Sequence, residues 1–230
     1  MDELEHKVLQ SIARHRLIAD DTRPVIVGLS GGADSVALLA TLTALGYRCV
    51  AAHCNFGLRG EESIRDRDHS RAIADRLGCE WITTEFNTRA YMLQNGISLE
   101  MACRDLRYNW FAEQLNALGA QAIAVAHHRD DNIETLMLNL LRGSGIRGLR
   151  GMRPRNGDII RPLLECTRSD ITAYLERRAI PYITDSSNLE NDVARNRLRN
   201  IVLPCIYREF PQAPDTISRT IAILAGTEPV

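Results

Sequence analysis

Lysine is almost absent from this chain: Lys7 is the only lysine among 28 lysine and arginine residues. A Walker-type phosphate loop requires a Gly-Lys-Ser/Thr string, so this absence excludes that class of nucleotide site. The dinucleotide fingerprint G-x-G-x-x-G is also missing, because the first glycine turn reads GLSGGADS. If the chain binds phosphate groups, it must do so through another arrangement.

Two other absences narrow the class of protein. The six cysteines are scattered and form no C-x-x-C pair, so we expect idle or buried thiols and no compact zinc or redox site. No apolar run approaches the ~20 residues of a membrane helix. The first residues, MDELEHKVLQ, lack the apolar core of a signal peptide. The sequence therefore predicts a cytoplasmic protein with no membrane partner.

The basic residues are almost all arginine, and seven of them gather between residues 142 and 168, where the only acidic residues are Asp158 and Glu165. Arginine suits phosphate groups because its planar fork donates two hydrogen bonds. A solvated basic face is an equally good explanation of the cluster, and the formal net charge of −1 predicts no polyanion partner by itself. Both interpretations stay open at this point.

Short apolar segments alternate with segments of helical spacing along most of the chain. We expect strands at 25–29, 48–54, 79–86, 121–128 and 158–164. We expect helices at 3–18, 34–45, 61–77, 99–118, 130–141, 167–180, 191–206 and 215–226. This order predicts an α/β fold, with a doubly wound, mainly parallel five-stranded sheet and helices on both faces. We expect a catalytic domain over residues 1–205 and a helical linker, or the start of a further region, over 206–230.

Ligands of such sheets bind beyond the carboxyl ends of the strands. Three polar segments follow strands here, namely SGGADS, NFGLRGEES and HHRDDNIET. We therefore expect all three segments at the same edge of the sheet.

The first of these segments, SGGADS, has the features of an anion-binding site. Glycine removes a side chain, so that backbone N–H groups approach an anion closely, and the following helix directs its free N–H groups at the same point. Ser30 and Ser35 add hydroxyl donors. Asp34 would repel phosphate groups unless a divalent cation lay between them, and Mg²⁺ binds through one or two carboxylates together with substrate phosphates. The segment therefore predicts a site for phosphate and Mg²⁺.

The SGGADS string resembles the pyrophosphate loop of the N-type ATP pyrophosphatases, the PP-loop superfamily. Within it the chain is similar to the tRNA(Ile)-lysidine synthetase family. The matching segments cover most of residues 24–205 and read HCNFGLRGEES, EMACRDLRY, AHHRDDNIET, LRGSGIRGLRGM, IRPLL and TDSSNLENDVARNRLR. The ordered set of segments is far more specific than the loop alone.

The resemblance implies roles for individual residues. Catalytic roles are implied for Asp34, Asp131, Arg104, Arg107 and Arg195, with Asp34 and Asp131 also as Mg²⁺ ligands. Nucleotide contacts are implied for Ser30, Gly31, Gly32, Ala33, Asp34, Ser35, His53, His127 and Arg142. Contacts to tRNA or substrate are implied for Arg59, Glu134, Arg147, Arg150 and Arg197.

The resemblance also implies a reaction. ATP would adenylate the C2 carbonyl oxygen of the wobble cytidine in the CAU anticodon of tRNA(Ile). Free lysine would then displace AMP and form lysidine. Asp131 would take a proton from the amine of lysine, which is mostly protonated at neutral pH. The sequence leaves the oligomeric state open, with a homodimer as one alternative.

One residue departs from the family pattern: Phe56 stands where the family commonly has a second histidine in His-x-Asn-His-Gly-Leu-Arg. We infer that this imidazole does no chemistry, and a phenyl ring there could stack on a base. Two alternatives to the lysidine reaction remain: a tRNA thiolase of the same superfamily, for which the usual cysteine pair is missing, and a nucleotide-binding module without catalysis.

Overall fold

A computed structural model describes residues 1–183 and 194–226. Its strands are β1 (Val25–Gly28), β2 (Cys49–Asn55), β3 (Glu80–Glu85), β4 (Ala122–Ala124), β5 (Arg155–Asn156) and β6 (Ile159–Ile160). Its helices up to the last strand are α1 (Glu3–His15), α2 (Ala33–Ala44), α3 (Glu61–Arg76), α4 (Thr88–Asn95), α5 (Leu99–Ala117), α6 (Arg129–Leu141) and α7 (Gly145–Leu149). The remaining helices are α8 (Arg168–Arg177), α9 (Ala194–Arg197), the π-helical turn η2 (Leu198–Val202), α10 (Leu203–Glu209) and α11 (Ala213–Leu224).

The strands form one sheet in the order β3-β2-β1-β4-β6-β5, and all neighbours are parallel except β5 and β6. The chain runs outward from β1 to β3 and then returns to the other side of β1 with β4. The reversal of strand order therefore lies between β1 and β4, which is where such sheets bind their ligands. The α/β fold with a mainly parallel sheet is confirmed.

The five expected strands are all present, and the sheet of the described residues has a sixth that we did not anticipate. β5 and β6 form a short antiparallel hairpin that turns at Gly157, whose φ is +59°. Two short helices, α4 and α7, also lie where we expected no regular structure. Asn87 caps α4 by accepting a hydrogen bond from the backbone N–H of Ala90 at 3.2 Å.

The two faces of the sheet bury alternate residues of the same strand. Val25 and Val27 point into a core formed with α1, α2, α3 and α8. Ile26, between them, packs into a second core with Phe111 of α5. A strand that is buried on both faces reads as a continuous apolar run, which is why VIV carries no polar residue.

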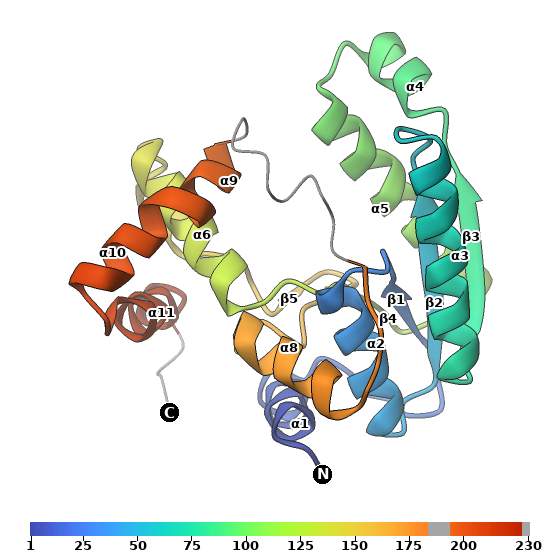
Figure 1. Ribbon diagram of the computed structural model, residues 1–230, viewed down its shortest axis with the longest axis horizontal. Helices are drawn as coiled ribbons and strands as arrows, with labels where there is room; N and C mark the ends of the chain where they lie inside the picture. The colour runs from blue at the N-terminus through green and yellow to red at the C-terminus, as the bar shows by residue number, and fades with distance from the viewer. Residues whose placement is uncertain (184–193, 227–230) are drawn as a thin grey trace.

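A third core lies beside the sheet, where Figure 1 shows α6, α9, α10 and α11 grouped together. Its buried members are Ile133, Leu136, Leu198, Leu203 and Ile221. The expected boundary at residue 205 falls inside α10, and residues on both sides of it pack into this core. The division into domains stays a prediction.

None of the helices in residues 1–183 and 194–226 is long and apolar enough to cross a membrane.

Leu38 of α2 is fully buried in the core that α2 forms with α1, α3 and α8, so we expect its truncation to destabilise the fold strongly. Leu38→Ala removes buried methyl groups and leaves a cavity, so we expect the free energy of unfolding to fall by about 2–5 kcal/mol. Urea unfolding measures it. Leu93→Ala is the control, because Leu93 is 75% exposed and should change the stability by less than about 0.5 kcal/mol. Equal effects of the two changes would contradict this packing.

Candidate nucleotide and magnesium site

The turn between β1 and α2 forms the first wall of the site. Ser35 Oγ accepts a hydrogen bond from the backbone N–H of Ser30 at 3.1 Å and donates one to the carbonyl oxygen of Gly32 at 2.9 Å. Outside the turn, the N–H of Ile183 donates to the carbonyl oxygen of Gly31 at 2.9 Å. These bonds hold the turn in one shape before any ligand arrives.

The first turn of α2 has no side-chain cap. Its N-cap residue is Gly32, whereas α8 begins with a capping box between Thr167 and Asp170. The first N–H groups of a helix have no partner within the helix. At α2 they are therefore directed at the space beyond β1 and can donate to an anion there.

The two glycines of the turn serve different purposes. Gly31 has a φ of +87°, and a Cβ atom would lie 3.1 Å from Ser70 Oγ, so the fold itself requires glycine there. Gly32 has φ −74° and ψ 159°, and a Cβ atom would meet nothing nearer than 3.6 Å. The fold does not require glycine at position 32. Its missing side chain instead leaves room for a ligand to approach the backbone.

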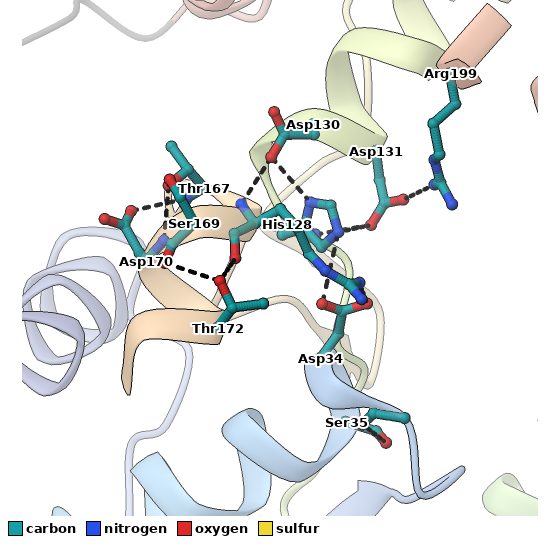
Figure 2. Close-up of polar contacts among 12 residues, drawn as sticks. Asp34, Ser35, His128, Asp130, Asp131, Thr167, Ser169, Asp170, Thr172 and Arg199 are labelled. Atoms are coloured by element: carbon teal, nitrogen blue, oxygen red, sulfur yellow. Dashed lines mark hydrogen bonds and ion pairs between the residues drawn. The ribbon is translucent and has the colours of Figure 1, made fainter. Parts of the chain in front are cut away.

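The second wall is a cluster of carboxylates around His128, the N-cap residue of α6 (Figure 2). The imidazole is buried, and its nitrogens lie 3.7 Å from Asp34 Oδ1, 3.5 Å from Asp130 Oδ2 and 3.4 Å from Asp131 Oδ2. Arg168, the first residue of α8, donates to Asp34 Oδ2 from its side chain and to Asp130 Oδ2 from its backbone N–H, the latter at 2.8 Å. The N-termini of α2, α6 and α8 thus meet at one point.

The charges of the cluster shift its pKa values. Burial alone would lower the pKa of His128, but the neighbouring carboxylates raise it above its ordinary value. Burial raises the pKa of Asp34, and the positive charges of His128 and Arg168 oppose this shift only in part. For Asp130 the bonds from His128 and Arg168 outweigh burial and lower the pKa. The three carboxylates thus favour the protonated form of His128, whose positive charge lies among them.

Two arginines from the segment after residue 193 join the cluster from the side of the third core. Arg199 donates from Nη2 to Asp131 Oδ1 at 2.9 Å and to Glu134 Oε2 at 2.9 Å. Arg195 donates to Thr135 Oγ1 at 2.8 Å and lies 3.6 Å from Glu134. Glu134 is 1% exposed, and burial raises its pKa against the effect of Arg199. The structure thus brings Arg195 and Glu134 next to Asp131.

His127 has an arginine as its partner instead of a carboxylate. Arg161 Nε donates to His127 Nδ1 at 3.3 Å, so this nitrogen must accept and the proton of the neutral ring is on Nε2. Burial, to which the charges of Arg161 and Arg195 add, holds the pKa of His127 well below its ordinary value. Arg104 is close enough to Arg161 for its charge to lower the pKa of that guanidinium. Arg104 itself packs over the ring of Tyr108 at 5.0 Å, and its contact with a ligand stays a prediction.

His53 contacts the residue that precedes the turn between β1 and α2. Its Nδ1 donates to the carbonyl oxygen of Leu29 at 2.9 Å, directly before Ser30. The ring is buried, and burial lowers its pKa. A neutral imidazole in this place positions the phosphate-binding turn, while a direct nucleotide contact stays a prediction.

Two other expected site residues, Arg107 and Arg59, already contact side chains within the protein. Arg107 packs over the ring of Phe56 at 5.2 Å, and Phe86 stacks on that ring at 5.6 Å, so Phe56 already has partners within the chain. Arg59 forms an ion pair with Asp66 at 3.0 Å.

Arg142 and Arg197 line a pocket at the C-terminal end of α6, whose other walls include Leu138, Leu141 and Leu198. Arg142 is the C-cap residue of this 13-residue helix. At 1.5 Å per residue the pocket is about 20 Å from His128. Arg150 is exposed at the end of α7, and the side chain of Arg147 lies outside the described part of the structure. The ligand contacts expected for these four arginines stay predictions.

A magnesium ion fits the donors of the cluster. Asp34 Oδ1 is buried and accepts no hydrogen bond, which leaves a carboxylate oxygen available as a ligand. Within residues 1–183 and 194–226, no three His, Cys, Asp or Glu side chains are spaced to hold a metal by themselves. Mg²⁺ commonly binds through one or two carboxylates and completes its shell with phosphate oxygens and water, so this donor set suits Mg²⁺ together with a nucleotide.

The residue roles expected from the sequence did not include Arg168 or Arg199, although Arg168 belongs to the arginine cluster at 142–168 for which phosphate contact was one interpretation. The four-residue spacing of Arg195 and Arg199 places both on one helical face, and this was the available signal for Arg199. For Arg168 the signal was an arginine at the start of a helix, where the helix dipole disfavours a cation.

The chain matches the PP-loop domain family over residues 2–206. The tRNA(Ile)-lysidine synthase of Parabacteroides distasonis is 50% identical over 225 residues, which are 98% of this chain and 51% of that protein. The tRNA(Ile)-lysidine synthase of Bacillus subtilis is 40% identical over 213 residues, which are 89% of this chain and 45% of that protein. The chain thus spans about half the length of the curated relatives that it matches.

Solved structures with a similar fold include the U34-tRNA thiolase NcsA from Methanococcus maripaludis with its 4Fe-4S cluster. The TM-score is 0.79 at 17% identity, over 99% of this chain and 80% of that one. An NH3-dependent NAD synthetase from Campylobacter jejuni has a TM-score of 0.55 at 16% identity, over 100% of this chain and 98% of that one. At these identities the likeness shows the fold alone.

The difference between the two glycines is testable by substitution. Gly32→Ala should fold with unchanged or slightly higher stability, because its backbone angles suit alanine. Its affinity for an ATP analogue should fall at least tenfold, since the methyl group would occupy the space of the ligand. Urea unfolding and calorimetric titration measure the two effects.

Gly31→Ala is the matched control, and it should lose about 1–2 kcal/mol of stability because of its positive φ. Normal nucleotide affinity of the Gly32→Ala protein would show that the ligand does not approach this backbone.

The neighbouring histidines should differ in charge in the free protein. At pH 7 we expect His128 to carry two ring protons and His127 one, on Nε2. The charge of His128 stabilises the fold below its unfolded-state pKa of about 6.5, and this contribution is lost as the pH rises through its raised folded-state pKa. Long-range ¹H–¹⁵N NMR of the rings distinguishes these states. Titration of both rings near pH 6.5 would contradict the described contacts.

Proposed function

Since the chain belongs to the PP-loop domain family, we propose that it is the ATP-binding and catalytic part of a tRNA(Ile)-lysidine synthetase. Its substrates are ATP, free lysine and tRNA(Ile) with the CAU anticodon, and its products are lysidine in the tRNA, AMP and pyrophosphate. An enzyme with these substrates works in the cytoplasm. The oligomeric state, including a homodimer, stays open.

One observation carries this proposal: the uncapped N-terminus of α2, with a glycine that the fold does not require, faces the carboxylate cluster of Asp34 and Asp131. Backbone donors on one side and carboxylates on the other fit a phosphate chain that is bridged to the protein by Mg²⁺. This is the arrangement that adenylation requires, because pyrophosphate is the leaving group and its charge must be stabilised.

Each group of residues at the site has its own role in the proposed reaction. The N–H groups of the turn over residues 30–35 bind the β- and γ-phosphates and stabilise the departing pyrophosphate. Asp34 and Asp131 would hold Mg²⁺, which would neutralise phosphate charge. His127 would donate from Nε2 as a neutral ring, and Arg195 adds positive charge near it. Arg104 and Arg107 would contact ATP phosphates or substrate, as the resemblance implies. The target cytidine must leave its stack in the anticodon to reach these groups.

In the first step the C2 carbonyl oxygen of the cytidine attacks the α-phosphorus, and the bond to pyrophosphate breaks. In the second step the ε-amine of lysine attacks C2, and the bond from C2 to the oxygen of AMP breaks. The ε-ammonium group must lose one proton before the amine can attack, and a carboxylate of α6 receives that proton. Asp131 is our choice, as the resemblance implies, and it lies in the first turn of α6.

The described cysteines argue against a thiolase. Sulfur transfer requires a thiolate, and burial raises the pKa values of Cys49, Cys54 and Cys166 to about 12. Burial also raises the pKa values of Cys79 and Cys103. Cys205 is exposed but lies on α10, beside the third core and away from the strand ends.

The proposed reaction predicts three products from one incubation. The chain, with tRNA(Ile), lysine and Mg-ATP, should release pyrophosphate and AMP, and nucleoside analysis by mass spectrometry should detect lysidine. Asp34→Asn keeps the size of the side chain and removes a Mg²⁺ ligand, so it should reduce pyrophosphate release at least a hundredfold with little change in stability.

Detection of a thiolated nucleoside in this incubation would contradict the lysidine reaction and favour the thiolase alternative. A protein that binds ATP and releases no pyrophosphate in the presence of tRNA and lysine would be a binding module. Normal turnover of the Asp34→Asn protein would remove the proposed metal role of Asp34.

A further inference from the structure

Arg168 joins two of the three helices that meet at the site. Its guanidinium donates to Asp34 Oδ2 at the start of α2, and its backbone N–H donates to Asp130 Oδ2 at the start of α6 at 2.8 Å. The side chain is 47% exposed, so it has room to move. It therefore contacts the turn over residues 30–35 through Asp34.

The stability of α8 does not explain an arginine at this position. The N-terminus of α8 is already complete, because Thr167 and Asp170 form a capping box. A cation in the first turn of a helix opposes the helix dipole. An ion pair between side chains this exposed contributes under about 1 kcal/mol. We therefore look for the role of Arg168 in its contact with Asp34 and in the binding of a ligand at the site.

We propose that Arg168 is a phosphate-binding residue of the nucleotide site. When ATP occupies the turn over residues 30–35, the guanidinium of Arg168 donates to phosphate oxygens. In the free protein the Asp34 carboxylate takes the place of those oxygens, as a planar acceptor that accepts from the same guanidinium. The proposal rests on the proposed function for the presence of ATP and adds a residue to its site.

A second role for Arg168 has to be separated from this one. Arg168 also orients Asp34, and it partly offsets the effect of burial on the charge of that carboxylate. Removal of the guanidinium would then weaken nucleotide binding indirectly, because an unbalanced carboxylate would repel phosphate. The two roles differ once Asp34 has no charge: a phosphate contact still contributes to binding, and an effect through Asp34 disappears.

The test is a double-mutant cycle on nucleotide affinity. Calorimetric titration with α,β-methylene-ATP, which cannot release pyrophosphate, is carried out in EDTA on the wild type, Arg168→Gln, Asp34→Asn and the double variant. We expect Arg168→Gln to weaken binding about tenfold, and to do so in the Asp34→Asn background as well. Arg168→Lys should recover part of the affinity, since it keeps one donor and the charge.

Arg177→Gln is the matched control. Arg177 lies at the other end of α8, is 50% exposed, and forms an ion pair of similar kind with Asp2 at 2.8 Å. This variant should bind the analogue as the wild type does, and thermal unfolding should show that all variants remain folded. An equal loss in Arg177→Gln would mean that α8 shifts as a whole, and would overturn the proposal.

Two further results separate this proposal from the proposed function. If Arg168→Gln has no effect in the Asp34→Asn background, Arg168 acts only through Asp34 and contacts no phosphate. If the wild type does not bind the analogue in either EDTA or Mg²⁺, the nucleotide site itself is wrong and both proposals fail. Tight binding by the wild type without lysidine formation would leave Arg168 in its role and remove only the tRNA reaction.

Discussion

The contact of one buried imidazole with three carboxylates holds the site of this protein together. His128 lies within 3.7 Å of Asp34, Asp130 and Asp131, and thereby joins the N-termini of α2 and α6. Three negative charges so close together would repel one another strongly without a positive partner. In the free protein the protonated ring and the guanidinium of Arg168 supply that positive charge. In the proposed complex Mg²⁺ would supply it together with the surrounding residues.

Helix α6 connects this cluster to the rest of the molecule. Its first turn carries Asp130 and Asp131, while Ile133 and Leu136 pack into the third core with α10 and α11. Arg199 binds Asp131 and Glu134 from that same side. The position of the carboxylates therefore depends on the third core, where α6 lies beside α9, α10 and α11 (Figure 1).

The sequence predicted the part of the site that is local. The glycine turn and the acidic start of α6 each follow a strand, and the alternation of strands and helices was sufficient to place them at the same edge of the sheet. It did not predict the contact of Arg168 with Asp34 across 134 positions of the chain, or the bond of Arg199 to Asp131 across 68. Such contacts depend on how α8 and η2 pack, and no spacing within a helix encodes that packing. β5 and its antiparallel pairing with β6 were missed because a two-residue strand carries no periodicity.

The most direct test of this account is a crystal structure of the chain with α,β-methylene-ATP and Mg²⁺. The account predicts that the β- and γ-phosphates accept hydrogen bonds from backbone N–H groups at the start of α2, and that the metal ion lies between them and Asp34. A triphosphate bound elsewhere, with the turn between β1 and α2 in contact with water alone, would contradict it.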